Sequence, residues 1–281
     1  HWLRLEESWR AAREHQFHPA AVTALLGEAL AAVTLLGAAL KFRGTLTLQV
    51  RGNGLLPLLI AQCTHDRRLR GVAQPREGAI VPDDASLADL VGDGQLVVTV
   101  DNEEGMLWQG IVPLVGGSLS ACLERYFETS EQLPTRLVLA ADGHRAAGLL
   151  LQKLPSPEGM GEGEEGRRRD LWDEAALLHA TLGGRELLDT EADVLLHRLF
   201  GEHDLRLFEG ESVAFGCRCS AERVADVLRS LGEAEAMDII AEQGAISVTC
   251  EFCHRPYRYD AIDVAQLFSE APAAGASGAL N

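Results

Sequence analysis

Four of the six cysteines form two close pairs near the end of the chain, and these are the residues best suited to chemistry. Cys217 and Cys219 make the first pair, and Cys250 and Cys253 make the second. Two close cysteine pairs joined by a spacer of domain size are typical of a tetrahedral zinc site with four thiolate ligands. The spacing therefore predicts that one Zn²⁺ is held by all four sulfurs.

Other kinds of site use the same residues. The zinc could be a purely structural clip for a domain too small to fold by packing alone. A thiol–disulfide catalyst would need a helix after Cys253, whereas the sequence indicates a returning strand. Cys250 to His254 formally matches a c-type haem attachment motif. A haem site would leave Cys217 and Cys219 without a role, and it would require export of the protein, for which no signal is visible. We therefore expect His254 to lie on the surface near the metal and not to bind a haem iron.

The elements around the cysteines follow from capping residues and apolar spacing. Ser220 is expected to cap a helix that ends at Leu231, which places Cys219 at a helix N-terminus, where a thiolate is favoured. Residues 245–249 and 257–259 read as two strands joined by a tight turn, and Asp260 is expected to cap a last helix. The side chains expected to face inward are Val224, Val227, Leu228, Leu231, Ile240, Ile246, Phe252, Ile262, Val264, Leu267 and Phe268.

Charge is distributed unevenly along the 281 residues and suggests three regions. Residues 1–154 contain 17 acidic and 14 basic residues, a net charge of −3. Residues 155–216 contain 15 acidic and 6 basic residues, a net of −9, and residues 217–281 contain 10 and 5, a net of −5. We therefore predict an α+β protein with an N-terminal mixed sheet-and-helix domain, an acidic helical linker and a small C-terminal zinc-binding domain.

The first region alternates between helical and strand patterns. A long apolar helix is expected over residues 21–42, and the turn Gly52–Gly54 predicts a hairpin between residues 45–51 and 55–60. A second hairpin is expected from residues 95–101 and 106–112, and a third from residues 136–140 and 147–151. Between them, Ser118 can cap a helix that Pro134 ends.

The acidic middle region contains short amphipathic helices. Their apolar positions are Leu171, Trp172, Leu177, Leu178, Leu187, Leu188, Leu195, Leu196, Leu199 and Phe200. Because short helices with many like charges are marginal alone, we expect this region to be held by docking, and to lose its dock when the zinc domain unfolds.

Composition excludes several classes of function. A net charge of −17 opposes binding to a nucleic-acid backbone. No apolar run is expected to cross a bilayer, because Glu28 interrupts the richest one, and no secretory signal is visible, so we expect a cytoplasmic protein. Metalloprotease, nucleophile-elbow, dinucleotide and phosphate-loop motifs are missing, which argues against an enzyme. We expect Cys122 to be buried as a small apolar side chain, and we assign no function to Cys63.

The chain resembles the bacterial redox-regulated heat-shock chaperones of the 33 kDa family. The resemblance covers almost the whole chain and rests on Leu40–Gln49 (LKFRGTLTLQ), Gly110–Pro113, Tyr126–Thr135 (YFETSEQLPT), Gly148–Gln152, Phe215–Arg223 (FGCRCSAER) and Cys250–Cys253. Three features depart from the family: a further N-terminal strand is expected to be missing, consistent with truncation before His1; His254 replaces a smaller or polar residue; and the tail after Glu270 is unremarkable.

The resemblance implies a holdase that binds unfolding client proteins without ATP and is inactive while reduced and zinc-bound. In such proteins, peroxide with heat, or hypochlorite, oxidises the four cysteines, releases zinc and unfolds the C-terminal region, and the active form is a homodimer. By this likeness the disulfides would pair Cys217 with Cys219 and Cys250 with Cys253.

An alternative from another class is a zinc ribbon that docks to nucleic acid or a protein partner and has no redox switch. Such modules carry basic residues around the metal, and Arg218, Arg223, Arg255 and Arg258 are candidates. The surrounding region is nevertheless acidic, which favours the chaperone over the ribbon.

Overall fold

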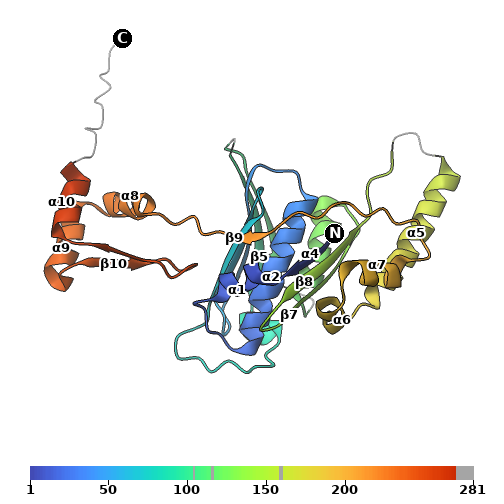
Figure 1. Cartoon of the computed structure of the whole chain (residues 1–281), viewed down its shortest axis with the longest axis horizontal. Coiled ribbons are helices and arrows are strands. Elements are labelled where there is room, and N and C mark those ends of the chain that lie inside the picture. Colours follow the sequence, from blue (N-terminus) through green and yellow to red (C-terminus); the bar gives the residue numbers. More distant parts are fainter. Residues whose placement is uncertain (104, 115–116, 158–160, 270–281) are drawn as a thin grey trace, which may run out of the picture. The chain divides into compact units, whose positions relative to one another are not determined.

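The computed structural model describes residues 1–103, 105–114, 117–157 and 161–269. The chain divides into two compact units, residues 1–216 and residues 217–281 (Figure 1). The mixture of sheets and helices confirms the predicted α+β class.

Six strands of the first unit form one sheet in the order β6-β5-β2-β3-β4-β9. Their bounds are Gly44–Gly52 for β2, Leu58–Thr64 for β3, Arg68–Gln74 for β4, Gly94–Asn102 for β5, Leu107–Pro113 for β6 and Ala214–Phe215 for β9. Neighbours are antiparallel, except that β9 runs parallel to β4. Two of the predicted hairpins are therefore present, although β3 begins three residues later than expected because the apolar pair before Pro57 belongs to the connection.

A second sheet has three antiparallel strands in the order β1-β8-β7. Their bounds are Trp2–Leu5 for β1, Thr135–Ala141 for β7 and Ala146–Gln152 for β8. The β7–β8 pair is the third predicted hairpin. Strand β1 was not predicted, because four residues are too few to show an alternating pattern.

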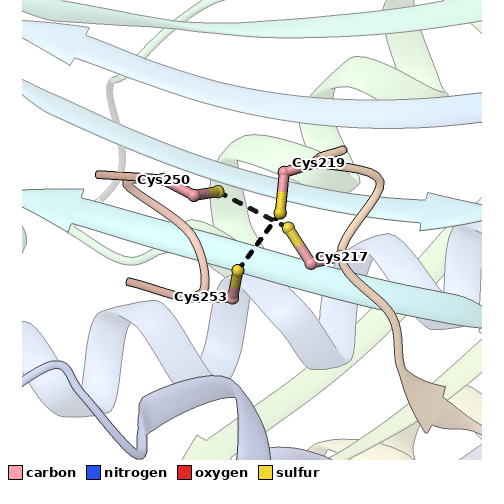
Figure 2. Close-up of side chains that lie close together, drawn as sticks. All are labelled: Cys217, Cys219, Cys250 and Cys253. Carbon is pink, nitrogen blue, oxygen red and sulfur yellow. Dashed lines mark hydrogen bonds between the residues drawn. The ribbon is translucent and has the colours of Figure 1, made fainter. Parts of the chain in front are cut away.

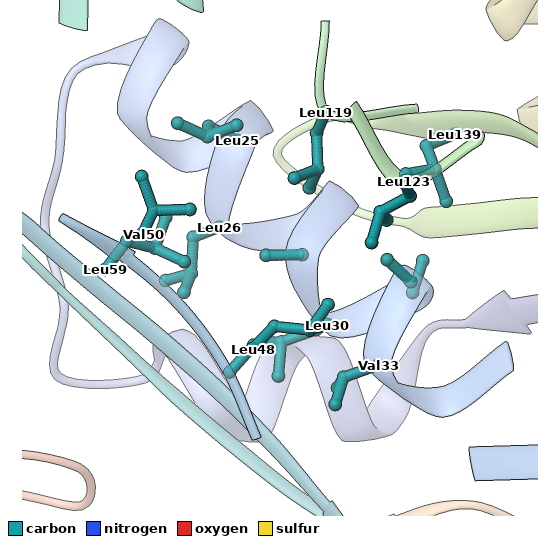
Figure 3. Close-up of a cluster of buried hydrophobic side chains, with 14 of the residues drawn as sticks. Leu25, Leu26, Leu30, Val33, Leu48, Val50, Leu59, Leu119, Leu123 and Leu139 are labelled. Atoms are coloured by element: carbon teal, nitrogen blue, oxygen red, sulfur yellow. The ribbon is translucent and has the colours of Figure 1, made fainter. Parts of the chain in front are cut away.

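Helix α2, Ala20–Ala39, packs between the two sheets, and this position accounts for its apolar composition. Figure 3 shows Leu26 and Leu30 of this helix beside Leu48 of the six-stranded sheet. The approach to β7 is so close that a Cβ at Gly27 would lie 2.4 Å from that of Ala141. A helix covered on two sides needs apolar residues around most of its circumference, which is the observed composition.

The expectation that no segment is long enough to cross a bilayer was wrong. By length and composition α2 could do so, and 78% of its most apolar window is buried within the fold. Glu28 interrupts the apolar run without ending the helix. Burial raises the pKa of Glu28 to about 7.

Helix α4, Leu119–Tyr126, begins as the sequence predicts. The Ser118 hydroxyl accepts a hydrogen bond from the Ala121 amide. The helix continues as a π-helical turn over Phe127–Glu131 and ends at Gln132, which has a left-handed backbone, so it stops before Pro134. The short helices α1 and α3 cover Glu7–Arg13 and Leu87–Val91.

The acidic region after β8 forms three helices whose apolar residues pack on the three-stranded sheet. The helices are α5 (Glu162–Ala180), α6 (Gly184–Asp189) and α7 (Ala192–Phe200). Leu187 and Leu195 are fully buried in a cluster with Leu149 of β8, and the buried His179 ring bonds the Leu149 carbonyl at 3.1 Å. The acidic helices are therefore docked on other structure, as predicted. They pack on β7 and β8 of the first unit, so the expectation that the zinc domain holds them was wrong. Leu171 and Leu177 are exposed.

The second unit is small and has a small core. It contains α8 (Ala221–Leu231), α9 (Glu233–Gln243), β10 (Ile246–Thr249), β11 (Pro256–Tyr259) and α10 (Ala261–Ser269). Its buried apolar cluster consists of Leu228, Ala236, Ile240, Ile246 and Val264. Several predicted inward positions are wrong or only half right: Val227 and Leu231 are exposed, and Val224, Phe252, Leu267 and Phe268 are half-buried. Ile262 is exposed as well.

Candidate metal centre

The two cysteine pairs lie in two short connections of the second unit. Cys217 and Cys219 precede α8, and Cys250 and Cys253 lie in the turn between β10 and β11. Two backbone hydrogen bonds close this turn, from the Cys250 amide to the Arg255 carbonyl and from the His254 amide to the Cys250 carbonyl. His254 has a positive φ of 53°, which the tight turn requires.

The helix and the hairpin form as the capping residues predict. The Ser220 hydroxyl accepts a hydrogen bond from the Arg223 amide at the start of α8. The Asp260 carboxylate accepts bonds from the Ile262 and Asp263 amides at the start of α10. Cys219 therefore immediately precedes a capped helix, and both ligand segments are attached to regular structure.

The four sulfurs converge on one point (Figure 2). All four Sγ atoms lie within 4.8 Å of one another, with Cys217 and Cys250 separated by 3.6 Å and Cys219 and Cys253 by 3.4 Å. A tetrahedral zinc with Zn–S bonds of about 2.3 Å requires sulfur–sulfur distances of about 3.8 Å. None of the four cysteines is in a disulfide, so the donor set and its spacing fit a metal ion of this kind.

The thiols differ in acidity. Burial alone would raise the pKa of Cys217, but hydrogen bonds from the Cys219 amide and from neighbouring thiols lower it to about 7. Burial raises the pKa of Cys253 to about 12 and also raises that of Cys250. A group of close thiols thus shares negative charge unevenly, and a cation at its centre would favour all four as thiolates.

The remaining candidate residues lie elsewhere. His254 is exposed and does not belong to the cluster of possible ligands, as expected for a surface neighbour. Cys122 is buried in α4, as predicted, and Cys63 is buried in β3, where burial raises its pKa to about 11. The pKa of the Arg255 guanidinium is raised mainly by its interaction with Tyr257, and further by the charges of Cys219 and Cys253. No sequence signal distinguished Arg255 from the other arginines near the cysteines.

Comparison with known proteins places this centre in a family. The family model described as "Hsp33 protein" matches residues 1–260. The chain belongs to the Hsp33 family. It is 46% identical over 268 residues to the 33 kDa chaperonin of Pseudomonas savastanoi pv. phaseolicola, covering 95% of this chain and 88% of the relative. It is 45% identical to the 33 kDa chaperonin of Nitrosococcus oceani, covering 95% of this chain and 89% of that relative.

The fold is also that of an Hsp33 structure. The crystal structure of the 33 kDa chaperonin of Thermotoga maritima superposes with a TM-score of 0.82 at 24% identity, covering 95% of this chain and 92% of the other. The predicted family is thus confirmed, and membership supports a chaperone role.

Proposed function

We propose that the chain is a redox-regulated, ATP-independent holdase whose resting form holds one Zn²⁺ through Cys217, Cys219, Cys250 and Cys253. The observation that supports this most is the convergence of four free thiols at tetrahedral spacing in a member of the Hsp33 family. When bound, the zinc would keep the sulfurs ionised and join two segments far apart in sequence. We place the protein in the cytoplasm, where thiols stay reduced.

Oxidation converts the thiolates to disulfides. Each pair of thiolates loses two electrons to one peroxide or hypochlorite molecule; peroxide takes up two protons and leaves as two waters, while hypochlorite leaves as chloride and one water. We propose pairs of near neighbours, Cys217 with Cys219 and Cys250 with Cys253. Near-neighbour disulfides remove the connection between the segment before α8 and the β10–β11 turn. A bond between Cys217 and Cys250 would instead retain that connection, so the pairing decides whether oxidation frees the fold.

The second unit has little other support. Among its described residues, 217–269, five apolar side chains form the buried cluster, and one of them is an alanine. Structural zinc contributes about 10–16 kcal/mol in small domains, which a core of this size does not replace. We therefore propose that oxidation unfolds residues 217–268.

The acidic linker connects that event to client binding. Strand β9 is followed by Cys217 after a single residue, so unfolding of the second unit begins next to the sheet edge. Residues 155–216 carry a net charge of −9, which favours expansion once their contacts with β7 and β8 loosen. Apolar side chains released from this docking would bind unfolded clients, while the charge keeps the complex soluble. The active form is proposed to be a homodimer.

The test compares three samples of the full chain: reduced with zinc, reduced and treated with a chelator, and treated with peroxide. A chromogenic chelator follows zinc release, and light scattering follows the aggregation of a chemically unfolded model protein. We expect release of about one zinc per chain, two disulfides by mass spectrometry, and suppressed aggregation only after oxidation. Zinc release without any gain in suppression would contradict the proposal. Binding to nucleic acid in a gel-shift assay of the reduced form would favour the zinc-ribbon alternative.

A further inference from the structure

The two edges of the six-stranded sheet differ in whether other parts of the chain cover them. At one edge, β9 pairs with Arg68 and Leu69 of β4 (Figure 1), and the buried Gln16 side chain bonds the Gly71 carbonyl and the Ala73 amide. The chain therefore covers this edge with its own groups. At the other edge, β6 pairs only with β5 among the described residues.

The register of β5 and β6 shows which main-chain groups are free. The Asn102 amide bonds the Met106 carbonyl, and the Leu114 amide bonds the Gly94 carbonyl. In an antiparallel pair hydrogen-bonded residues alternate with non-bonded ones, so Leu107, Gln109 and Ile111 direct their N–H and C=O groups away from β5. Within the described part of the chain, no hydrogen bond reaches these groups.

The side chains along this edge are uncharged, and apart from that of Gln109 they are apolar. Leu107 and Ile111 are 67% and 60% exposed, and Met106 and Trp108 also reach solvent. No Asp, Glu, Lys or Arg occurs from Gly105 to Leu123, the longest such interval in a chain with 24% charged residues. Soluble proteins ordinarily protect an edge strand with a charge, a bulge or a covering segment, and in the described part of the chain β6 has none of these along Leu107–Val112.

We propose that the β6 edge binds extended, uncharged apolar segments of unfolded proteins as an added β-strand. The inference rests on the proposed chaperone function and names a surface and a binding mode for it. Three outward-facing residues at alternate positions match a segment of about five residues, or about 17 Å. Main-chain hydrogen bonds would supply affinity without sequence preference, which suits a protein that meets many clients.

A client fits this edge better than a second copy of the chain. Each copy carries a net charge of −17, so two short β6 strands alone would have to overcome the repulsion between two acidic chains, and the proposed homodimer would need a further interface. An unfolded apolar segment brings no such repulsion. The edge is open while the cysteines are thiols, so we expect weak binding before oxidation and tighter binding when released linker surfaces add a second contact.

The test uses a fluorescein-labelled peptide, Thr-Val-Thr-Val-Thr-Val-Thr, and a copy methylated on every amide nitrogen after the first residue, so that neither edge of the copy keeps a hydrogen-bond donor. Methylation removes strand-forming N–H groups and leaves the side chains unchanged. Fluorescence anisotropy measures the affinity of both peptides for the reduced and the oxidised full chain. Two variants block the edge: Ile111→Lys adds a charge, and Gln109→Pro removes an outward N–H. Ile80→Lys is the matched control, because Ile80 is 91% exposed outside the strands.

We expect methylation and either edge variant to weaken peptide binding at least tenfold, and Ile80→Lys to leave it unchanged. Hydrogen exchange should slow at the Leu107, Gln109 and Ile111 amides when peptide is bound. Circular dichroism establishes that each variant folds, and Ile111→Lys alone decides the matter if Gln109→Pro does not. Equal binding by wild type and Ile111→Lys, equal binding of both peptides, or no binding would overturn the proposal. A dimer lost in the edge variants with peptide affinity unchanged would assign the edge to a second copy instead.

The experiments distinguish failure of the redox-chaperone proposal from failure of the β6 binding site. If oxidised wild type suppresses aggregation and the edge variants do so equally well, the redox chaperone stands and the β6 site is wrong. If the peptide binds at β6 and oxidation brings no gain in suppression, the redox switch is wrong and the β6 site stands.

Discussion

Replacing Val264 by alanine should weaken zinc binding, although Val264 is not one of the four cysteines. Val264 is fully buried in the core of the second unit. Its replacement removes two methyl-sized groups, each worth about 0.8 kcal/mol, and leaves a cavity, for a total of about 2 kcal/mol. If the metal-free unit is unfolded, zinc binding includes the free energy of folding, so the same 2 kcal/mol appears as an approximately 30-fold weaker apparent affinity.

The assay is competition between the reduced full chain and a chromogenic chelator. Val227→Ala is the matched control, because Val227 also lies in a helix of the second unit but is 64% exposed. Both substitutions change helix propensity alike, so their difference isolates the buried contact. We expect the Val227→Ala affinity to stay within about twofold of wild type. If Val264→Ala lowers the thermal stability of the second unit while its zinc affinity equals that of wild type, the coupling of folding to metal binding is refuted.

Three further predictions concern single side chains. Cys250→Ser should lower the zinc-to-protein ratio from about one to near zero by atomic emission, whereas Cys122→Ala should leave it unchanged. Burial raises the pKa of Glu28 above its value in the unfolded chain, so the stability of the first unit should fall as pH rises from about 4.5 to 7 and then level off. Glu28→Gln should remove this fall, roughly 3 kcal/mol, in urea titrations followed by tryptophan fluorescence; an unchanged pH profile would contradict it. Gln16→Leu leaves two main-chain groups of β4 without partners and should cost about 3 kcal/mol in the same titration, and a loss below 0.5 kcal/mol would show that water replaces the amide. The tryptophans that report on the first unit are Trp2, Trp9, Trp108 and Trp172.

The clustering of the four cysteines was the most predictable part of the candidate site. Few kinds of site use four cysteines at this spacing. Ser220 and Asp260 show where α8 and α10 begin, because their side chains accept hydrogen bonds from main-chain amides of the first helical turn. The three hairpins were also visible, because alternating strands and glycine turns are local signals. The division into residues 1–154, 155–216 and 217–281 stays a prediction.

Other features depend on tertiary contacts that no local pattern reveals. Helix α9 follows α8 after one glycine and contains acidic and apolar residues without a clear stripe, so it was not predicted. Val227 appeared to face inward from spacing alone, but the small Ala225 and Leu228 define the buried side of α8. Strand β9 has two residues and exists only because the edge of β4 pairs with it. The docking of the acidic helices on β7 and β8 likewise depends on a sheet in which β8 of this hairpin pairs with β1, more than 140 residues away in sequence.

Strand β9 also affects how force would pass along the chain. Its short pairing with β4 includes bonds from the Ala214 amide to the Arg67 carbonyl and from the Gly216 amide to the Leu69 carbonyl, and the ion pair of Arg67 with Glu211 supports it. Bonds of this kind contribute about 0.5–1.5 kcal/mol each, so thermal motion separates β9 far more often than a seven-residue strand. Tension applied at Cys217 would therefore peel this short strand away first and leave the rest of the sheet intact.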